Sequence, residues 1–304
     1  MQKGKQKSMN KTNVSFILFC TLVPVIGFLV FYIYPNYSAF AMAFTNSSGE
    51  LSFDNFIRFY NEITSEGTPL HEALINTLIV FGIQVVTFPL KVLVSYFIYK
   101  KIPLANVYRI LFFLPSIIFS VAVAFVFQRM VGVNGFIAEW VQNIMGLDYT
   151  PELLADSRFA NYTIWLKMLW LGFPGDLIIW GGTFSRIPVD VLESARVDGV
   201  SWWTEFTKII VPMVWPTVAL QMVLMVCGIF GVTGGEWLLT SGEYGTRTFT
   251  SWIYDTMYRG SGGSYKSNMF NYLSAVGMVM TVISISLSLI VRNITDKVFD
   301  EVDF

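Results

Sequence analysis

Very few residues of this sequence could carry out catalysis. Among the 304 residues there is one histidine, His71, and there are two cysteines, Cys20 and Cys227. A metal cluster or a disulfide framework needs several such residues at characteristic spacings, and both cysteines lie inside apolar segments. An enzyme that works within a membrane would need a histidine–carboxylate or serine–lysine constellation, whereas His71 lies at the edge of an apolar segment. We therefore expect a chain that has no catalytic activity alone and binds no metal.

Three ionisable residues lie inside long apolar segments: Lys91, Lys167 and Asp176. A charge in the middle of a lipid-embedded segment costs a few kcal/mol, so each of them needs an explanation. Lys91 and Lys167 stand close enough to the ends of their segments for the side chains to snorkel towards the polar interface. Asp176 is deeper and should face protein or a water-filled cavity. It could pair with another subunit or contact a transported solute.

The composition identifies the solvent of these segments as lipid. Hydrophobic residues make up 54% of the chain, charged residues only 13%, and the mean hydropathy is +0.56. Soluble domains carry about 25% charged residues. Disorder and coiled coils are excluded, and the net charge of -1 offers no field that would attract nucleic acid. Segments of about 20 apolar residues can cross a bilayer as a helix, and we predict six: 14–34, 73–97, 110–128, 161–182, 214–232 and 272–291.

The positions of the basic residues predict the topology. Twelve Lys and Arg fall in the tails and in alternate loops, and six fall in the remaining loops. Cytoplasmic loops retain basic residues, so both termini should be cytoplasmic. We divide the chain into a cytoplasmic tail (1–13), a first spanning helix with an extracytoplasmic loop (14–72), a core of five spanning helices (73–291) that contains a cytoplasmic loop (185–213), and a cytoplasmic tail (292–304).

The first apolar segment has an alternative interpretation as a cleaved signal peptide. Basic residues precede it, and Ala41-Met42-Ala43 is similar to a processing site. The apolar core of a signal peptide is about 7–15 residues long, however, and this run is longer. Its removal would also leave the alternation of the basic loops unexplained, so we favour a retained helix.

A glycine-rich segment at 260–267 differs by one residue from a phosphate-binding loop. It reads GSGGSYKS, with Tyr265 where G-x-x-x-x-G-K-[ST] has its second glycine. That loop holds phosphate with backbone N–H groups between a strand and a helix. Here no strand is expected, and the segment should lie on the outer side, away from cytoplasmic ATP. If ATP drives this protein, another chain must bind it.

The predicted cytoplasmic loop between the fourth and fifth segments has the signals of two helices. Pro188 suits a first helical position, Gly199 a left-handed stop, and Ser201 the cap of a second short helix. Leu192, Ala195 and Arg196 share one face of the first helix. The small Ala195 would leave a low point that another surface could approach. The alternative is an amphipathic loop that only joins two spans.

The spacing in this loop resembles a known family motif. It is similar to the EAA loop in permease subunits of binding-protein-dependent ABC importers. The matching pattern is Glu193-x-Ala195, then Gly199, then nine residues, then Ile209-x-Val211-Pro212. Ser194 and Val211 replace the family's usual Ala and Leu without changing the spacing. The resemblance covers about 73–291. It is closest to the carbohydrate branch, and in particular to the larger maltose-permease-like subunit, because 170–174 (WLGFP) and 238–240 (LLT) match as well.

This resemblance implies partners and a mechanism. It implies a pore shared with a second homologous permease subunit, two ATPases docked on the EAA loops, and an extracytoplasmic solute-binding protein. ATP and Mg would be used by the partner ATPases, with no cofactor bound by this chain. Seven residues of the loop are the implied coupling residues: Leu192, Glu193, Ala195, Arg196, Asp198, Gly199 and Pro212.

The resemblance also implies residues that line a sugar path. Those positions are Ser116, Ser120, Met168, Trp170, Leu171, Gly172 and Gly175, to which Asp176 is added for its charge. Met225 in the fifth segment is a further candidate lining residue, but the match weakens there, because Met225 and its neighbours Gly228, Ile229 and Val232 replace polar or aromatic residues. Each of these side chains could instead be helix-packing material.

Together these features predict an all-α polytopic membrane protein with six transmembrane helices, both termini cytoplasmic, and the MetI-like fold of type I ABC importer permeases. It should lie in the cytoplasmic membrane of a prokaryote, in contact with lipid, and form half of a path for a carbohydrate, an oligosaccharide. An amino-acid or peptide permease is an alternative within the family. A secondary transporter would need an internal repeat and mid-membrane carboxylates, and only Asp176 is available.

Overall fold

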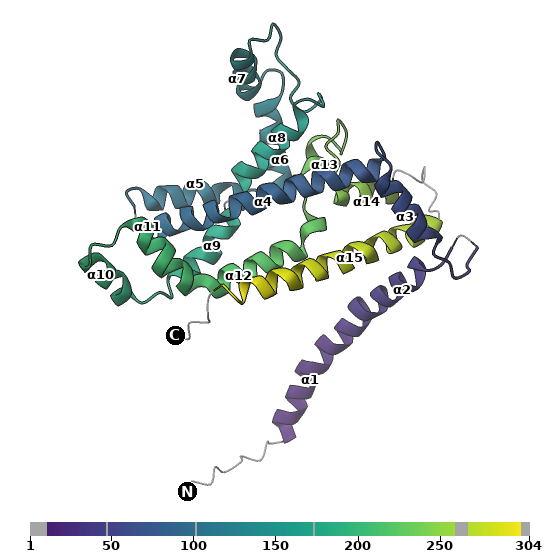
Figure 1. Cartoon of the computed structure of the whole chain (residues 1–304), viewed down its shortest axis with the longest axis horizontal. Coiled ribbons are helices and arrows are strands. Elements are labelled where there is room, and N and C mark those ends of the chain that lie inside the picture. Colours follow the sequence, from purple (N-terminus) through teal and green to yellow (C-terminus); the bar gives the residue numbers. More distant parts are fainter. Residues whose placement is uncertain (1–10, 47, 101, 173, 259–266, 299–304) are drawn as a thin grey trace. The chain divides into compact units, whose positions relative to one another are not determined.

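The computed structural model describes residues 11–46, 48–100, 102–172, 174–258 and 267–298 (Figure 1). Within these ranges the regular structure is helical, apart from one antiparallel bridge between Thr45 and Leu51. Most of the segment that is similar to a phosphate loop, 260–266, lies outside the described residues. The all-α prediction is confirmed for the part of the chain that is described.

The chain divides into two compact units, Met1–Asn61 with Ser264–Val279, and Glu62–Gly263 with Met280–Phe304. In the first unit α1 (Lys11–Phe28), a π-helical turn η1 (Leu29–Ile33) and α2 (Tyr34–Ala43) follow one another without a break. Helix α3 (Asp54–Thr64) begins in this unit, and the first half of α15 (Ser267–Thr295) belongs to it. The Asn271 side chain donates to the Thr45 carbonyl (2.9 Å), and the Arg58 guanidinium lies 3.9 Å from the centre of the Tyr272 ring.

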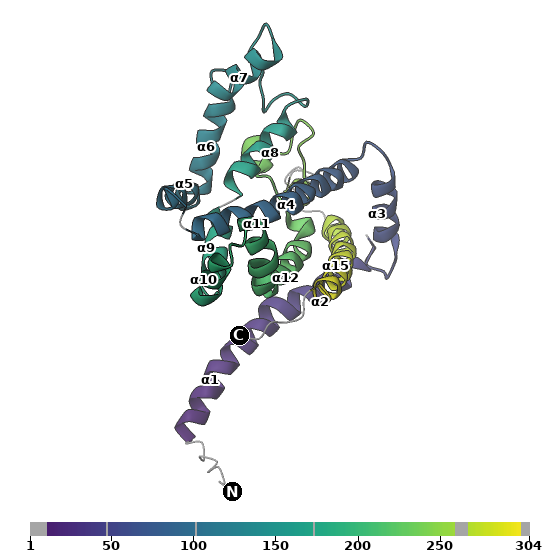
Figure 2. The same cartoon turned by 60° about the vertical axis from the view of Figure 1, so that its left-hand side comes forward.

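The second unit is built on α4 (Pro69–Tyr99), which lies alongside α5 (Ala105–Ile117) and α9 (Pro174–Phe184) in Figures 1 and 2. The Thr68 hydroxyl caps α4 by accepting from the His71 N–H group. A hydrophobic core joins α4 and α9 to α12 (Val211–Cys227); its largest fully buried side chains are Trp180, Tyr96 and Phe184. Helix α12 is also bound to the second half of α15, because Trp215 Nε1 donates to the Thr295 carbonyl (2.9 Å).

A second core lies among the shorter helices of this unit. It joins α6 (Ser120–Val131), α7 (Phe136–Met145), α8 (Ala160–Leu171) and α13 (Glu236–Leu239), and Phe127 lies at its centre, 1% exposed. Helix α14 (Phe249–Tyr258) returns to α4, where the Phe249 N–H group donates to the Thr77 hydroxyl (2.8 Å).

Five helical stretches of the described residues are long and apolar enough to cross a membrane: Phe19–Ala43, Pro69–Tyr99, Ser120–Met145, Trp202–Cys227 and Met269–Thr295. They overlap five of the six predicted segments. The fourth, 161–182, is not among them, because α8 and α9 are separate helices. The structure therefore shows a polytopic protein with at least five candidate spans.

The structure divides each of the predicted spans 110–128 and 161–182 into two helices. Helix α5 ends at Ile117, after Pro115, which lacks the N–H group that a helix needs to hold its preceding turn. Ile118 and Phe119 are then extended, with ψ of 139° and 129°, before α6 starts. Pro174 opens α9, a position at which proline is favoured because its missing N–H group would have no partner.

The loop 185–213, which was predicted to be cytoplasmic, also differs from its prediction in its helices. The first helix, α10 (Val189–Val197), has Pro188 at its cap and not at its first helical position. The second helix is not a separate short one, since α11 (Trp202–Glu205) and a π-helical turn η2 (Phe206–Ile210) continue directly into α12. Ser201 is the cap of α11 as predicted, and its hydroxyl accepts from the Thr204 N–H group (3.3 Å). The second helix of the loop and the predicted fifth span are therefore one continuous helical segment.

Candidate functional site

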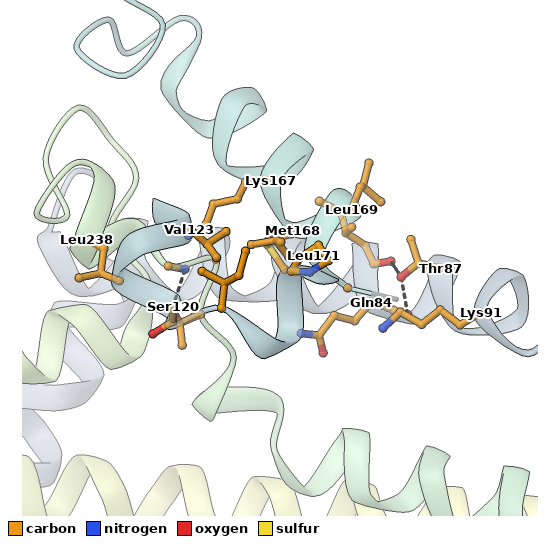
Figure 3. Close-up of a pocket in the computed structure, with 17 residues that line it drawn as sticks. Gln84, Thr87, Lys91, Ser120, Val123, Lys167, Met168, Leu169, Leu171 and Leu238 are labelled. Atoms are coloured by element: carbon orange, nitrogen blue, oxygen red, sulfur yellow. Dashed lines mark hydrogen bonds between the residues drawn. The ribbon is translucent and has the colours of Figure 1, made fainter. Parts of the chain in front are cut away.

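The second unit contains a cavity of about 670 Å³ at the places where its helices are interrupted (Figure 3). Its walls come from α4, the α5–α6 break, the end of α8 and the segment 233–238. Gln84, Thr87, Ser120 and Thr233 supply hydroxyl and amide groups, and Met168 supplies apolar surface. Cavities of this size with a few polar groups are typical of sites for small solutes.

Glycine is required at the interruption of α8. Gly172 ends the helix, and a β-carbon there would lie 2.7 Å from the Met168 carbonyl oxygen. In a membrane, irregular backbone persists only where protein covers it or water fills a cavity beside it. Both Gly172 and Ile118, at the two helix breaks, line the cavity. The breaks and the cavity therefore belong to one structural feature.

Lys91 and Asp176 form an ion pair across α4 and α9. Lys91 Nζ lies 2.8 Å from the Asp176 carboxylate, and the two side chains are 17% and 29% exposed. The expectation that Lys91 snorkels alone to the interface is wrong, because a partner 85 positions away in the sequence holds its charge. Asp176 finds its partner within the same chain. Of the two, only Lys91 is among the described residues that line the cavity.

We expect the Lys91–Asp176 pair to behave as a unit. Lys91→Met and Asp176→Asn should each lower the thermal midpoint of the purified protein in detergent, because each leaves one partly buried charge unpaired, at a cost of about 1–3 kcal/mol. The double variant should be more stable than the less stable of the two single variants. Additive losses measured by thermal denaturation would show that the two charges act independently.

Lys167 is the second lysine of the cavity. It is 7% exposed, on α8, and its Nζ lies so close to Gly235 that a β-carbon there would clash with it. The expectation that Lys167 snorkels outward is therefore wrong. The nearby Glu236 is 1% exposed and accepts hydrogen bonds from the Thr233 hydroxyl (3.2 Å), the Gly234 N–H group (2.9 Å) and the Thr248 hydroxyl.

The structure brings together only some of the predicted lining residues. Four of them lie in the cavity wall: Ser120, Met168, Leu171 and Gly172. Trp170 instead stacks on Phe127, with ring centres 6.2 Å apart, and neither it nor Met225 is among the described lining residues. The surroundings of Ser116 and Gly175 are outside what the structure describes.

The sequence prediction missed the contribution of α4 to the cavity. Gln84, Thr87 and Lys91 all line it, and their i, i+3, i+7 spacing places them on one face of the helix. A polar stripe along an apolar helix was the signal that could have found them. Thr233 carried no comparable signal, because it lies in a loop.

The loop 185–213, which we call the coupling loop after its predicted role, turns at a left-handed glycine, as predicted. Gly199 has φ of +65°. Its N–H group donates to the Arg196 carbonyl (3.1 Å), and the next N–H group, of Val200, donates to the Ala195 carbonyl (3.0 Å). This is the Schellman pattern that ends helices at glycine. It fixes the direction in which the chain leaves α10.

The exposed face of α10 is not the face that the sequence suggested. Ala195 is 5% exposed and Leu192 packs against the core of the second unit, so Ala195 offers no low point to a partner. Glu193, Arg196 and Asp198 are exposed, and Val197 is 87% exposed. Pro212, at the start of α12, is half-buried. A partner protein would therefore meet a largely acidic face with two exposed valines, Val189 and Val197.

A buried carboxylate fastens the loop to α4. Glu205 is 5% exposed, and its two oxygens accept from the Tyr96 hydroxyl (2.8 Å) and from Lys100 Nζ (2.6 Å). Trp202 packs on Phe97, with ring centres 5.3 Å apart. Sequence reasoning missed Glu205, which lies 105 positions from Lys100. The loop and α4 are thus joined by charge, hydrogen bonding and aromatic packing.

These features define a class of protein: an α-helical, multi-pass membrane protein with a cavity at broken helices and a structured loop fixed to its helical core. Comparison with known proteins identifies the family. Residues 88–300 match the family described as "Binding-protein-dependent transport system inner membrane component". Because this match covers more than half of the sequence, the chain belongs to that family and is a multi-pass component of the inner membrane.

Individual relatives are distant but similar over most of their length. The arabinooligosaccharides transport system permease protein AraP of Bacillus subtilis (strain 168) is 23% identical over 277 residues, which cover 88% of this chain and 84% of that protein. The lactose transport system permease protein LacF of Rhizobium radiobacter is 24% identical over 279 residues, covering 88% and 90%.

A solved structure shares the fold. A chain in the crystal structure of a bacterial alginate ABC transporter, in complex with an alginate pentasaccharide-bound periplasmic protein, aligns with a TM-score of 0.78 and 24% identity. The alignment covers 95% of this chain and 97% of that one.

Proposed function

We propose that this chain is a permease subunit of an ABC importer that brings a carbohydrate, an oligosaccharide, into the cytoplasm. Relatives named for arabinooligosaccharide and lactose transport support the substrate class. The hydroxyl and amide groups of the cavity, from residues such as Gln84 and Thr87, are of the kind that bind sugar hydroxyls. A second permease subunit would complete the path, a solute-binding protein would deliver the sugar, and two ATPases would supply energy.

The observation that carries this proposal is the position of α9. This helix begins two residues after Gly172, in the wall of the cavity, and ends at Phe184, where the coupling loop starts. Its 11 residues correspond to about 16 Å. Because α9 is packed against α4 in a shared core, a displacement of the loop would be transmitted to the cavity as a movement of a rigid helix. We propose that α8 and α9 together form the sixth span.

Uptake by the assembled importer tests the substrate class. The chain would be reconstituted in proteoliposomes with its cognate second permease, ATPase and binding protein. We expect oligosaccharides to stimulate ATP hydrolysis and to accumulate inside. Stimulation by amino acids or peptides in place of sugars would reject the carbohydrate assignment and leave the family unaffected.

Cross-linking tests the contact with the ATPase. In a background carrying Cys20→Ser and Cys227→Ser, a Val197→Cys variant should be joined to an ATPase subunit by a short thiol–amine cross-linker, because Val197 is 87% exposed on α10. Trp140→Cys, on the exposed side of α7, is the matched control and should give no such product. Equal cross-linking from both positions, or none from Val197→Cys, would count against the docking role.

A further inference from the structure

We infer that the transported saccharide carries a negative charge, as the carboxylate of a uronic acid does, and that Lys167 binds this group. The inference deepens the proposed function and rests on it. It comes from the charge and burial of the cavity wall itself, independently of what any relative transports.

Lys167 is a buried ammonium group with no direct partner among the described residues, although the Glu236 carboxylate is near enough to act on its charge. Lys167 is 7% exposed, and no hydrogen bond or ion pair joins its Nζ to any other residue in the part of the chain that is described. A charge that leaves water is costly unless it is paired or hydrogen-bonded. Lys167 Nζ lies against Gly235 in the wall of the cavity. Because glycine has no β-carbon, there is room for the amine at this position.

The nearest carboxylate is already engaged. Glu236 accepts hydrogen bonds from Thr233, Gly234 and Thr248, and it is itself fully buried. Those bonds hold it in the loop and away from the cavity, since Glu236 is not among the described residues that line it. Lys167 therefore retains its donor capacity for a group that enters the cavity.

The rest of the wall has the same sign. The charged residues among the described lining residues are Lys91 and Lys167, one on α4 and one on α8. Asp176 balances Lys91 from outside the wall. A solute in the cavity thus meets ammonium groups, hydroxyls and amides, and no described carboxylate. This surface favours a carboxylate-bearing sugar over a neutral or an amino sugar, because charge-assisted hydrogen bonds are about twice as strong as neutral ones.

Paired substrates test the inference on the wild-type importer. The probes are di- and trisaccharides of glucuronate, galacturonate, mannuronate and guluronate, each with its carboxyl-reduced neutral form. ATP hydrolysis and uptake are measured in proteoliposomes. The thermal midpoint of the importer without binding protein is measured with the same probes, so that the permease is tested apart from its delivery protein. Inorganic phosphate and vesicles containing phosphatidylglycerol are included to distinguish a sugar carboxylate from other anions.

Variants then assign the effect to Lys167. With the preferred acidic sugar, Lys167→Met should lower uptake about 10- to 100-fold, as expected for loss of a charge-assisted hydrogen bond. Lys167→Arg should retain most uptake, because it keeps the charge. Lys297→Met, which removes an exposed lysine near the end of α15, is the matched control and should not change it.

The inference holds if at least one acidic sugar is transported and its neutral form is not, and if the acidic sugar alone raises the thermal midpoint. It is overturned if neutral sugars are taken up as well as acidic ones, if phosphate or phosphatidylglycerol gives the same stabilisation, or if Lys167→Met transports normally. Uptake of neutral sugars only would reject the charge and spare the proposed function. Uptake of no sugar at all would reject both.

Discussion

Replacing Gly199 with valine should lower stimulated ATP hydrolysis and uptake by about tenfold or more. Gly199 occupies left-handed backbone at φ +65°, where an ordinary residue costs about 1–2 kcal/mol and a β-branched one costs more. A penalty of about 1.4 kcal/mol changes an equilibrium tenfold. No atom lies within 4 Å of a β-carbon built at this position, so the effect arises from the backbone and not from a clash. The measurement is ATPase activity of the assembled importer with loaded binding protein.

Gly199→Asn is the matched control, because asparagine adopts left-handed backbone more readily than other residues. It should retain most of the activity. Both variants should insert into the membrane at wild-type levels, since Gly199 is exposed and lies outside the core. Wild-type stimulation in Gly199→Val would show that the turn after α10 does not transmit force.

Replacing Lys100 with methionine should cause the largest loss of stability among single substitutions near the coupling loop. Glu205 would then be a buried carboxylate that keeps only its hydrogen bond from Tyr96. Removing one partner of a buried ion pair costs roughly 3–5 kcal/mol. Because Glu205 keeps its hydrogen bond from Tyr96, we expect a loss near the lower end of this range. The thermal midpoint of the purified importer should fall accordingly.

A double-mutant cycle separates this pair from its surroundings. Lys100→Met with Glu205→Gln should recover much of the stability lost by Lys100→Met alone, because no charge is then left buried. The number of ATP molecules hydrolysed per sugar transported should rise in Lys100→Met, since the loop is less firmly held to α4. An unchanged ratio together with a lowered midpoint would restrict Glu205 to a structural role.

The helical segments and the turn of the coupling loop could be predicted from the sequence because their causes are local. Hydropathy over about 20 residues indicates a span, and Gly199 after an amphipathic stretch indicates a left-handed stop. The predicted ends of the spans were less accurate. The helix from Trp202 to Cys227 passes through Pro212 and Pro216 without ending, although proline usually interrupts a helix.

The pairings that shape the site could not be predicted, because they are set by packing between distant elements. Lys91 has the same local context whether it meets lipid headgroups or Asp176, and only the contact of α4 with α9 decides. Hydropathy did not reveal the interruption at Ile118, although Pro115 is a local signal for it. The apolar run continues through it, so hydropathy does not fall where the helix ends.

The interrupted helices have a consequence for biogenesis. At each break the last carbonyls of one helix and the first N–H groups of the next lack partners within their own helix, and hydrocarbon cannot supply any. Ile117 and Phe119, beside the first break, are largely exposed in the isolated chain. The cavity accommodates the breaks on one side, and the flank of Ile117 and Phe119 stays uncovered in a newly inserted copy until another protein packs against it. We expect quality-control proteases to remove orphan copies, so that abundance in the cell follows that of the assembling partner.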